Sequence, residues 1–232
     1  MTEKPEELHE QRTVVYSEDK WELLAHLRER ALQVLEKAKS VNIRGWAYGS
    51  LARGDVTESS DIDIIIPYVV PSYKIEMVLG RGILREIVQA TPSSVLKAHI
   101  HLDQKTVISF PLFKMMSREI EFYKWGGQVD EEKIASKKRV PGVDKRLILI
   151  QPTQKGHIES GVIGYENRVA KKLGVSPSVA KERVRVLTRR DEVGRTGVYL
   201  SKVVEENRSF EEVAKQLIDR DPAIRRTMKR RA

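Results

Sequence analysis

Residues 49–66 read GSLARGDVTESSDIDIII, and this stretch decides the fold that the sequence predicts. It pairs Gly49 with Ser50 and, twelve residues after the glycine, places Asp61 and Asp63 at the head of an isoleucine run. Side chains two apart on a strand share a face, so both carboxylates are expected to point the same way. Paired carboxylates suit Mg²⁺, which takes oxygen ligands and is shared with substrate phosphates. Glycine lets the backbone approach a ligand closely, and successive N–H groups in a turn bind anions. The stretch therefore predicts a phosphate-binding loop beside a metal-binding site.

The same stretch resembles the signature of the DNA polymerase beta-type nucleotidyltransferases, in particular the small minimal members of prokaryotes, which commonly contain Ala-Arg-Gly as residues 52–54 do here. The resemblance implies an α+β fold with a mixed sheet and helices. It also implies Mg²⁺-dependent (or Mn²⁺-dependent) transfer of a nucleoside monophosphate from an NTP to a hydroxyl, with release of pyrophosphate. Asp61 and Asp63 would be the catalytic metal ligands, and Gly49, Ser50 and Arg53 would bind the NTP. An Asx turn entering a buried strand is the alternative, but it leaves the Gly-Ser pair unexplained.

A third carboxylate, which related enzymes carry on a later strand, is missing from its expected place. The matching position is Val107, which cannot bind a metal. Two strands, at 98–102 and 106–110, are predicted to form a hairpin whose turn contains Asp103. A shifted hairpin would bring Asp103 into the site as the third catalytic acid, or His101 would supply a nitrogen ligand. Otherwise Asp103 lies in a solvated turn and the strand histidines face solvent.

The flanking pattern supports the fold that the motif implies. Apolar residues recur at helical spacing from an N-cap at Ser17 or Asp19 to about Lys39. A strand at 41–48 then leads into the Gly-Ser pair. A second helix is predicted at 72–90 with a kink near Gly80, a third helix at 112–125, and a basic-led strand at 145–150. Basic side chains around that last strand are candidate phosphate or base contacts, or ordinary loop residues: Lys145, Arg146, Lys155 and His157.

The second half of the chain carries the positive charge. Residues 1–120 hold 16 Lys and Arg against 17 Asp and Glu, whereas residues 121–232 hold 26 against 16. Such a bias favours a polyanionic partner, so an RNA or DNA acceptor is expected, with RNA ends favoured. We predict three parts: a nucleotidyltransferase-like domain at 1–127, a connector at 128–160 with a strand that joins the first domain, and a basic domain at 161–232.

The last part resembles a winged helix-turn-helix. A helix ends at Gly174, Ser176-Pro177 begins a basic second helix, and residues 192–200 are expected to form a two-stranded wing, followed by a helix at 209–217 and a basic tail at 225–231. In such modules the second helix enters the major groove and neighbouring cations contact phosphate. The expected nucleic-acid contacts are Lys181, Arg183, Arg185, Arg189, Arg190 and, at the wing tip, Arg195. The alternative is a helical scaffold that only shapes a substrate channel.

Composition narrows the class of protein. The 232 residues contain no cysteine, so neither disulfides nor thiolate metal sites are expected. The longest apolar runs are too short to cross a membrane, and the polar, acidic N-terminus is unlike a secretory signal. A cytoplasmic location is the resulting expectation. Two functions stay open: an active nucleotidyltransferase, or a nucleotidyltransferase-fold nucleic-acid-binding or regulatory protein with weakened or no catalysis.

Overall fold

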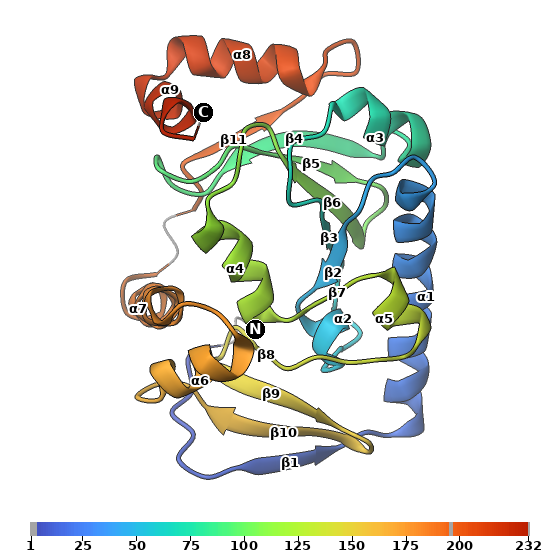
Figure 1. Ribbon diagram of the computed structural model, residues 1–232, viewed down its shortest axis with the longest axis vertical. Coiled ribbons are helices and arrows are strands. Elements are labelled where there is room, and N and C mark those ends of the chain that lie inside the picture. The colour runs from blue at the N-terminus through green and yellow to red at the C-terminus, as the bar shows by residue number, and fades with distance from the viewer. Residues whose placement is uncertain (1–3, 195–196, 232) are drawn as a thin grey trace. The chain divides into compact units, whose positions relative to one another are not determined.

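The computed structural model describes residues 4–194 and 197–231 (Figure 1). The chain divides into two compact units, each assembled from segments that are distant in the sequence. Unit 1 comprises Met1–Leu32, Ala47–Ser60 and Ile120–Thr196, and unit 2 comprises Gln33–Trp46, Asp61–Glu119 and Gly197–Ala232. The segment predicted as one C-terminal domain is therefore shared between them. None of the described helices is long and apolar enough to cross a membrane.

Unit 2 is built on a mixed sheet, as the motif implied. Its strands lie in the order β11 (Leu200–Val203), β4 (Leu84–Gln89), β5 (Lys97–His101), β6 (Thr106–Pro111) and β3 (Ile62–Ile65). Strands β3 and β6 are parallel and the other pairs are antiparallel. The predicted hairpin is confirmed as β5 and β6. Helix α3 (Ser72–Leu79) follows β3.

The prediction of a helix through 84–90 is wrong, because those residues form β4. Helix α3 ends at Gly80, and both Gly80 and Gly82 have positive φ, a conformation that stops a helix and turns the chain. The following residues alternate, with Arg85, Ile87 and Gln89 buried. That period of two fits a strand between β5 and β11. The segment also has apolar residues at helical spacing, and its pairing in the sheet selects the strand.

One side of this sheet forms the core of unit 2. The buried side chains Ile64, Ile87, Ile100 and Phe110 lie on that side, as the strand register shows. Helices α8 (Phe210–Arg220) and α9 (Pro222–Lys229) belong to the same unit (Figure 1). The ring of Phe210 meets Phe110 edge to face at 5.4 Å between centroids. The predicted helix at 209–217 is thereby confirmed, with the Ser209 side chain accepting a hydrogen bond from the Glu212 N–H.

The basic tail is part of this packing. Residues 222–229 form α9, and Arg231 is 6 % exposed. Its guanidinium forms an ion pair with Glu119 and donates to the Ser93 carbonyl at 2.7 Å. The same guanidinium lies 5.7 Å from the centroid of the Phe113 ring. Arg231 of the predicted basic tail is therefore an internal residue, because its charge is satisfied inside the unit.

Replacing Arg231 with alanine is expected to destabilise the protein by about 2–3 kcal/mol. The loss leaves the half-buried Glu119 carboxylate without its cation, although Glu119 keeps hydrogen bonds from the Val95 and Met116 N–H groups. Urea unfolding compares this variant with Arg230→Ala, in which the neighbouring exposed arginine is removed. Equal stability of the two variants would contradict a structural role for Arg231.

Unit 1 is built on a second, antiparallel sheet. Its strands lie in the order β1 (Arg12–Val15), β10 (Gly156–Gly161), β9 (Ile148–Thr153) and β8 (Gly142–Val143). The predicted strand at 145–150 begins later, since Asp144 to Leu147 form a turn in which Leu147 has a φ of +63°. Helices α6 (Glu166–Leu173) and α7 (Pro177–Val193) pack on this sheet through a core that includes Trp125, Leu149, Val169 and Val179. Gly174 ends α6 and Pro177 opens α7, as predicted.

The remaining elements connect these parts. Helix α1 (Glu18–Lys39), predicted from its apolar spacing, is confirmed, and the Ser17 hydroxyl accepts from the Lys20 N–H. Strand β2 (Trp46–Tyr48) is shorter than the predicted 41–48, and pairs with β7 (Gln128–Val129). Helix α4 (Ser117–Gly126) replaces the longer helix expected from 112, and α5 (Glu131–Ala135) lies in the predicted connector.

The predicted wing at 192–200 is not confirmed. Helix α7 extends to Val193, and Leu200, the last residue of the predicted wing, begins β11, which pairs with β4 in unit 2. An edge position on an existing sheet gives Leu200–Val203 main-chain partners that a short isolated hairpin provides less well. Arg195, the expected wing tip, lies outside the described residues.

Candidate active site

The Gly-Ser loop lies in unit 1, between β2 and the short helix α2 (Ser50–Arg53). Gly49 adopts φ +77° and ψ −142°, and its N–H donates to the Gly127 carbonyl at 2.9 Å. A Cβ at Gly49 would meet nothing within 4 Å, so the glycine is required by the backbone conformation and leaves open space beside the chain. This open space is what a phosphate-binding loop needs.

The loop closes back on itself at the aspartate end. The Ser50 hydroxyl donates to the Ser60 hydroxyl over 3.3 Å, and the Ser60 oxygen accepts from the Thr57 N–H at 2.9 Å. Ser60 is covalently followed by Asp61. The first members of the motif belong to unit 1, and the aspartates belong to unit 2.

Asp61 and Asp63 flank the start of β3 in unit 2. Asp61 is exposed and Asp63 is half-buried, whereas Ile62 and Ile64 between and beyond them are buried on the other side of the strand. The Ile62 N–H donates to the Lys105 carbonyl at 2.7 Å and fixes β3 beside β6. The alternation places Asp63 on the side of β3 opposite Ile62 and Ile64, and Asp61, which precedes the strand, is exposed.

Val107 occupies the position beside Asp63. In the parallel pairing of β3 and β6 these two residues are direct partners. Asp103 lies in the turn, where its carboxylate accepts from the Lys105 N–H at 2.9 Å and the Thr106 N–H at 2.7 Å. The shifted hairpin that would have made Asp103 the third acid is therefore wrong, because its carboxylate is used to close the turn.

The donor set fits one hard cation. Over residues 4–194 and 197–231, no group of three or more His, Cys, Asp or Glu side chains is arranged to hold a metal ion. Two carboxylates at the start of β3 nevertheless match what Mg²⁺ takes from a protein, since it is commonly bound by one or two carboxylates together with substrate phosphates. Asp61 and Asp63 are thus suited to a metal that arrives with the triphosphate.

A histidine–glutamate pair that the sequence did not reveal lies on the same side of the sheet as Asp63. His101 Nε2 is 2.9 Å from Glu86 Oε1, and the Ser201 hydroxyl donates to Glu86 Oε2 at 3.0 Å. Burial acts to raise the pKa of Glu86, but the hydrogen bonds from His101 and Ser201 outweigh it and lower the pKa. Glu86 was missed because its segment was predicted as helix. Only its place on β4 brings it beside β5.

His99 lies two residues from His101 on β5 and is more deeply buried. Its Nδ1 is 3.4 Å from the Ser109 hydroxyl. Burial, reinforced by the charge of Lys97, lowers the pKa of His99 to about 4. His99 is therefore neutral near pH 7, and its role is to fill the sheet surface with a polar group that carries no charge.

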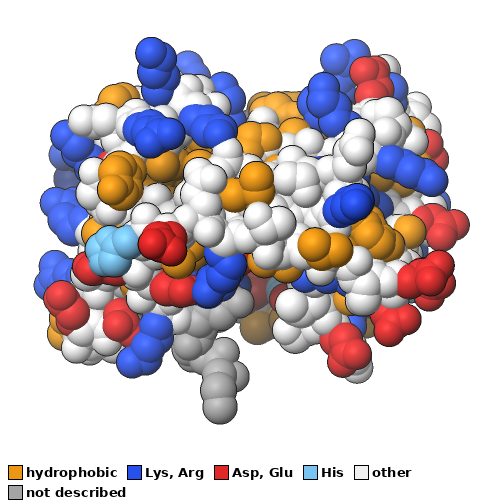
Figure 2. Space-filling model, turned by 90° about the horizontal axis from the view of Figure 1, so that it is seen from below, with side chains coloured by type: hydrophobic (Ala, Val, Ile, Leu, Met, Phe, Trp, Pro, Cys, Tyr) orange, Lys and Arg blue, Asp and Glu red, His pale blue; other side chains and the backbone are white. Residues whose placement is uncertain are grey.

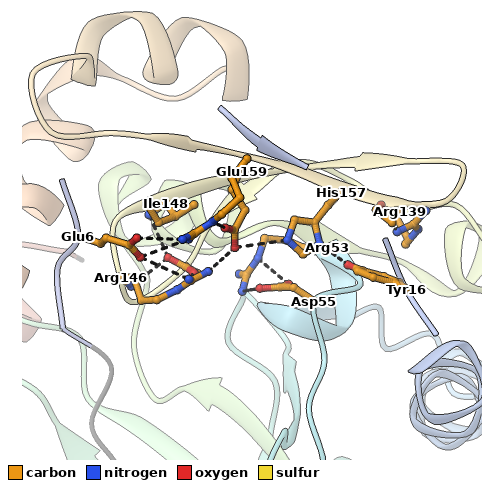
Figure 3. Close-up of polar contacts among 12 residues, drawn as sticks. Glu6, Tyr16, Arg53, Asp55, Arg139, Arg146, Ile148, His157 and Glu159 are labelled. Atoms are coloured by element: carbon orange, nitrogen blue, oxygen red, sulfur yellow. Dashed lines mark hydrogen bonds and ion pairs between the residues drawn. The ribbon is translucent and has the colours of Figure 1, made fainter. Parts of the chain in front are cut away.

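Arg53 does not reach toward a ligand. Its guanidinium forms a bidentate ion pair with Asp55 at 3.0 and 2.8 Å and donates to the Gly126 carbonyl at 2.7 Å (Figure 3). The residue is 6 % exposed. Against the expectation that it binds the NTP, the Arg53 guanidinium is paired inside unit 1, where it holds the loop after α2 against residue 126.

Two of the four basic residues around β9, Arg146 and His157, also have partners inside unit 1. Arg146 donates to Asp144 at 2.8 Å and to Glu159 at 2.6 Å, and His157 Nδ1 is 2.6 Å from the Tyr16 hydroxyl (Figure 3). Burial lowers the pKa of His157. Arg146 and His157 therefore stabilise the sheet of unit 1 and are not the phosphate or base contacts considered from the sequence. Lys145 and Lys155 are exposed.

The cations of α7 divide into two groups. Arg183 packs on the Phe122 ring at 4.7 Å, and burial, with the nearby Arg190, lowers its pKa to about 10. The prediction that Arg183 contacts nucleic acid is thereby corrected, since its guanidinium faces the protein. An open groove of about 610 Å³ runs along the other side of the helix, lined by Lys181, Arg185, Thr188 and Arg189 together with apolar and acidic residues. Arg190 is exposed.

The surplus of positive charge is not concentrated on the face drawn in Figure 2. Lys and Arg side chains are dispersed over that face, with Asp and Glu side chains among them. Net charge alone therefore does not define a binding surface here. The row along α7 is a more specific candidate, because its cations recur at helical spacing on one side.

Comparison with known proteins gives one result that bears on these sites. No match to the chain was found among curated proteins or among solved structures. The family model for the nucleotidyltransferase domain matches residues 28–125, a range that contains the Gly-Ser loop, both aspartates of β3 and the His101 strand. This part of the chain, less than half of its length, is similar to the nucleotidyltransferase domain family.

Proposed function

We propose that this protein transfers a nucleoside monophosphate from an NTP to a hydroxyl acceptor and releases pyrophosphate. The observation that carries the proposal is the coincidence of two features within one domain. Residues 28–125 match the nucleotidyltransferase family, and Asp61 and Asp63 of the motif lie at the start of β3, where neither is fully buried. The acceptor that we favour is a nucleic acid, with an RNA end ahead of DNA.

The roles follow from the geometry of each residue. Asp61 and Asp63 would hold Mg²⁺, or Mn²⁺, which would neutralise charge on the triphosphate. Gly49 leaves open backbone for the phosphates, and Ser50 places a hydroxyl beside Ser60. The protein contributes positioning and electrostatic stabilisation, which dominate phosphoryl transfer because little covalent chemistry is required of side chains.

The direct experiment supplies NTPs labelled at the α-phosphate, with Mg²⁺, to the purified protein together with total RNA, single-stranded DNA or no polymer. Incorporation of label into RNA that depends on Mg²⁺ supports the proposal. If the protein binds NTP but no label enters any acceptor, the result would support the second candidate. That candidate is a nucleotidyltransferase-fold binding or regulatory protein without catalysis, and Val107 beside Asp63 favours it.

The nucleic-acid partner is proposed to lie along α7. Lys181, Arg185 and Arg189 recur every four residues and line one groove, so a phosphate backbone would meet three cations in a row. Phosphate contacts of this kind position the polymer without reading its sequence. The apolar lining from Ile163 and Val184 leaves room for contact with bases or sugars.

Reversing the charge at Arg185 and Arg189, both to glutamate, is expected to weaken RNA binding by roughly tenfold or more at low salt and to reduce the slope of log K against log salt by about 2. Filter binding over a salt series measures both quantities. The matched control reverses the charge of Lys215 and Arg220, two exposed residues of α8, with the same change in net charge. An equal loss in both variants would assign the effect to net charge and contradict a site on α7.

A further inference from the structure

A row of three residues crosses the open side of the unit 2 sheet. Asp63 on β3 pairs with Val107 on β6, and Val107 pairs with His101 on β5. Direct partners on neighbouring strands point to the same side, and all three side chains are half-exposed. Val107 is thus an apolar floor with a carboxylate on one side and an imidazole on the other.

The spacing of the row leaves room for a reacting group. Neighbouring strands lie about 4.8 Å apart, so the backbones of Asp63 and His101 are separated by about 10 Å. Both side chains extend from the same side of the sheet, above the small Val107. A hydroxyl and a phosphate fit between the carboxylate and the imidazole, since each contact spans about 3 Å.

The pairing of His101 with Glu86 decides which imidazole nitrogen can accept a proton. Glu86 is held as a carboxylate, so at 2.9 Å the Nε2–H of His101 donates to it. The neutral imidazole then carries its lone pair on Nδ1. A carboxylate that orients an imidazole and stabilises its protonated form is the arrangement of a general base.

The charged surroundings of His101 come from several strands. Glu86 lies on β4, Ser201 on β11 bonds the second oxygen of Glu86, and Asp63 lies across Val107 on β3. On β5 itself the nearest titratable groups are His99, which stays neutral near pH 7, and Lys97.

We propose that His101 is the general base of the transfer reaction and that Glu86 is its positioning residue. His101 would take the role of the third carboxylate that related enzymes carry at the position of Val107. The proposal rests on the proposed function. The proton of the acceptor hydroxyl moves to His101 Nδ1 while the hydroxyl oxygen forms a bond to the α-phosphorus. The bond from that phosphorus to the oxygen bridging the α- and β-phosphates breaks, and its electron pair leaves with pyrophosphate.

The test measures kcat and KM across pH 5–9 for the wild type, His101→Asn, Glu86→Gln and a control, His26→Asn, which removes an exposed histidine of α1. His101→Asn is expected to lower kcat about 100-fold with the KM for NTP unchanged. A general base acts only in its unprotonated form, so the wild-type kcat is expected to fall toward low pH, and this acid limb is expected to be lost in His101→Asn. Glu86→Gln is expected to lower kcat about tenfold and to keep the acid limb.

Added imidazole separates a missing base from a damaged fold. It is expected to restore part of the kcat of His101→Ala and to leave the control unchanged. The proposal would be overturned if His101→Asn kept the kcat and the pH profile of the wild type. It would also be overturned if the His101 variants lost kcat with an unchanged pH profile and without recovery on addition of imidazole. If the wild type itself transfers no nucleotide to any acceptor while it still binds NTP, the proposed function fails first and takes this inference with it.

Discussion

Replacing Asp61 and Asp63 together with asparagine is expected to lower nucleotide transfer by a factor on the order of 10³ or more. Asparagine keeps the size of each side chain but removes the two negative charges at the start of β3. Removing one preorganised electrostatic contact to a transition state commonly costs about 10²–10³ in rate, and here two are lost. Because neither aspartate is fully buried, the fold is expected to persist.

The measurement follows transfer of α-labelled nucleotide and, separately, binding of NTP with and without Mg²⁺. The double variant should lose the Mg²⁺-dependent part of NTP binding as well as the transfer. A matched control, Asp19→Asn with Asp219→Asn, removes the same charge from exposed positions on α1 and α8. Transfer at the wild-type rate in the Asp61 and Asp63 variant would exclude these residues as the metal site.

Replacing Arg146 with methionine is expected to destabilise the protein by about 3–5 kcal/mol. The side chains of Asp144 and Glu159 are 6 % and 5 % exposed, and Arg146 bonds both of them. Methionine keeps much of the side-chain volume but leaves two buried carboxylates with fewer partners. Glu159 retains Arg12 at 2.5 Å, whereas Asp144 loses its arginine. Urea unfolding at pH 7 measures the difference.

The pH dependence of that loss identifies its cause. Hydrogen bonds from Arg146 and Arg12 outweigh burial and lower the pKa of Glu159, so its ion pairs add stability above the unfolded pKa that is lost as pH falls through the folded value. The gap between wild type and Arg146→Met should therefore narrow below about pH 4, where the carboxylates become neutral. Lys145→Met removes an exposed neighbour as a control. Equal stability of the two variants would contradict the account.

The sequence predicts well what local spacing determines. The first long helix and the β5–β6 hairpin both follow from patterns within about twenty residues, and the structure confirms them. Residues 84–89 carry both helical and strand periods, so only their pairing with β5 and with the distant β11 selects the strand. The same distant pairing places Leu200, the last residue of the predicted wing, on the edge of the unit 2 sheet.

Charged side chains are where sequence reasoning fails most. Arg53, Arg183 and Arg231 look like exposed cations in the sequence, but each is packed against a carboxylate, a ring or both. Their partners are Asp55 nearby and residues on other elements, and only the folded chain shows which cation is buried. The same holds for the Glu86–His101 pair, because half of it lay in a segment assigned to the wrong kind of element.

The proposed chemistry is tested most directly by the fate of two labels on the same NTP. The protein is incubated with Mg²⁺ and RNA, once with NTP labelled on the α-phosphate and once on the γ-phosphate. Nucleotide transfer predicts that the α label enters RNA and that the γ label leaves as pyrophosphate, in equal amounts. Appearance of the γ label in the acceptor or as orthophosphate, with no α label in RNA, would contradict nucleotidyl transfer.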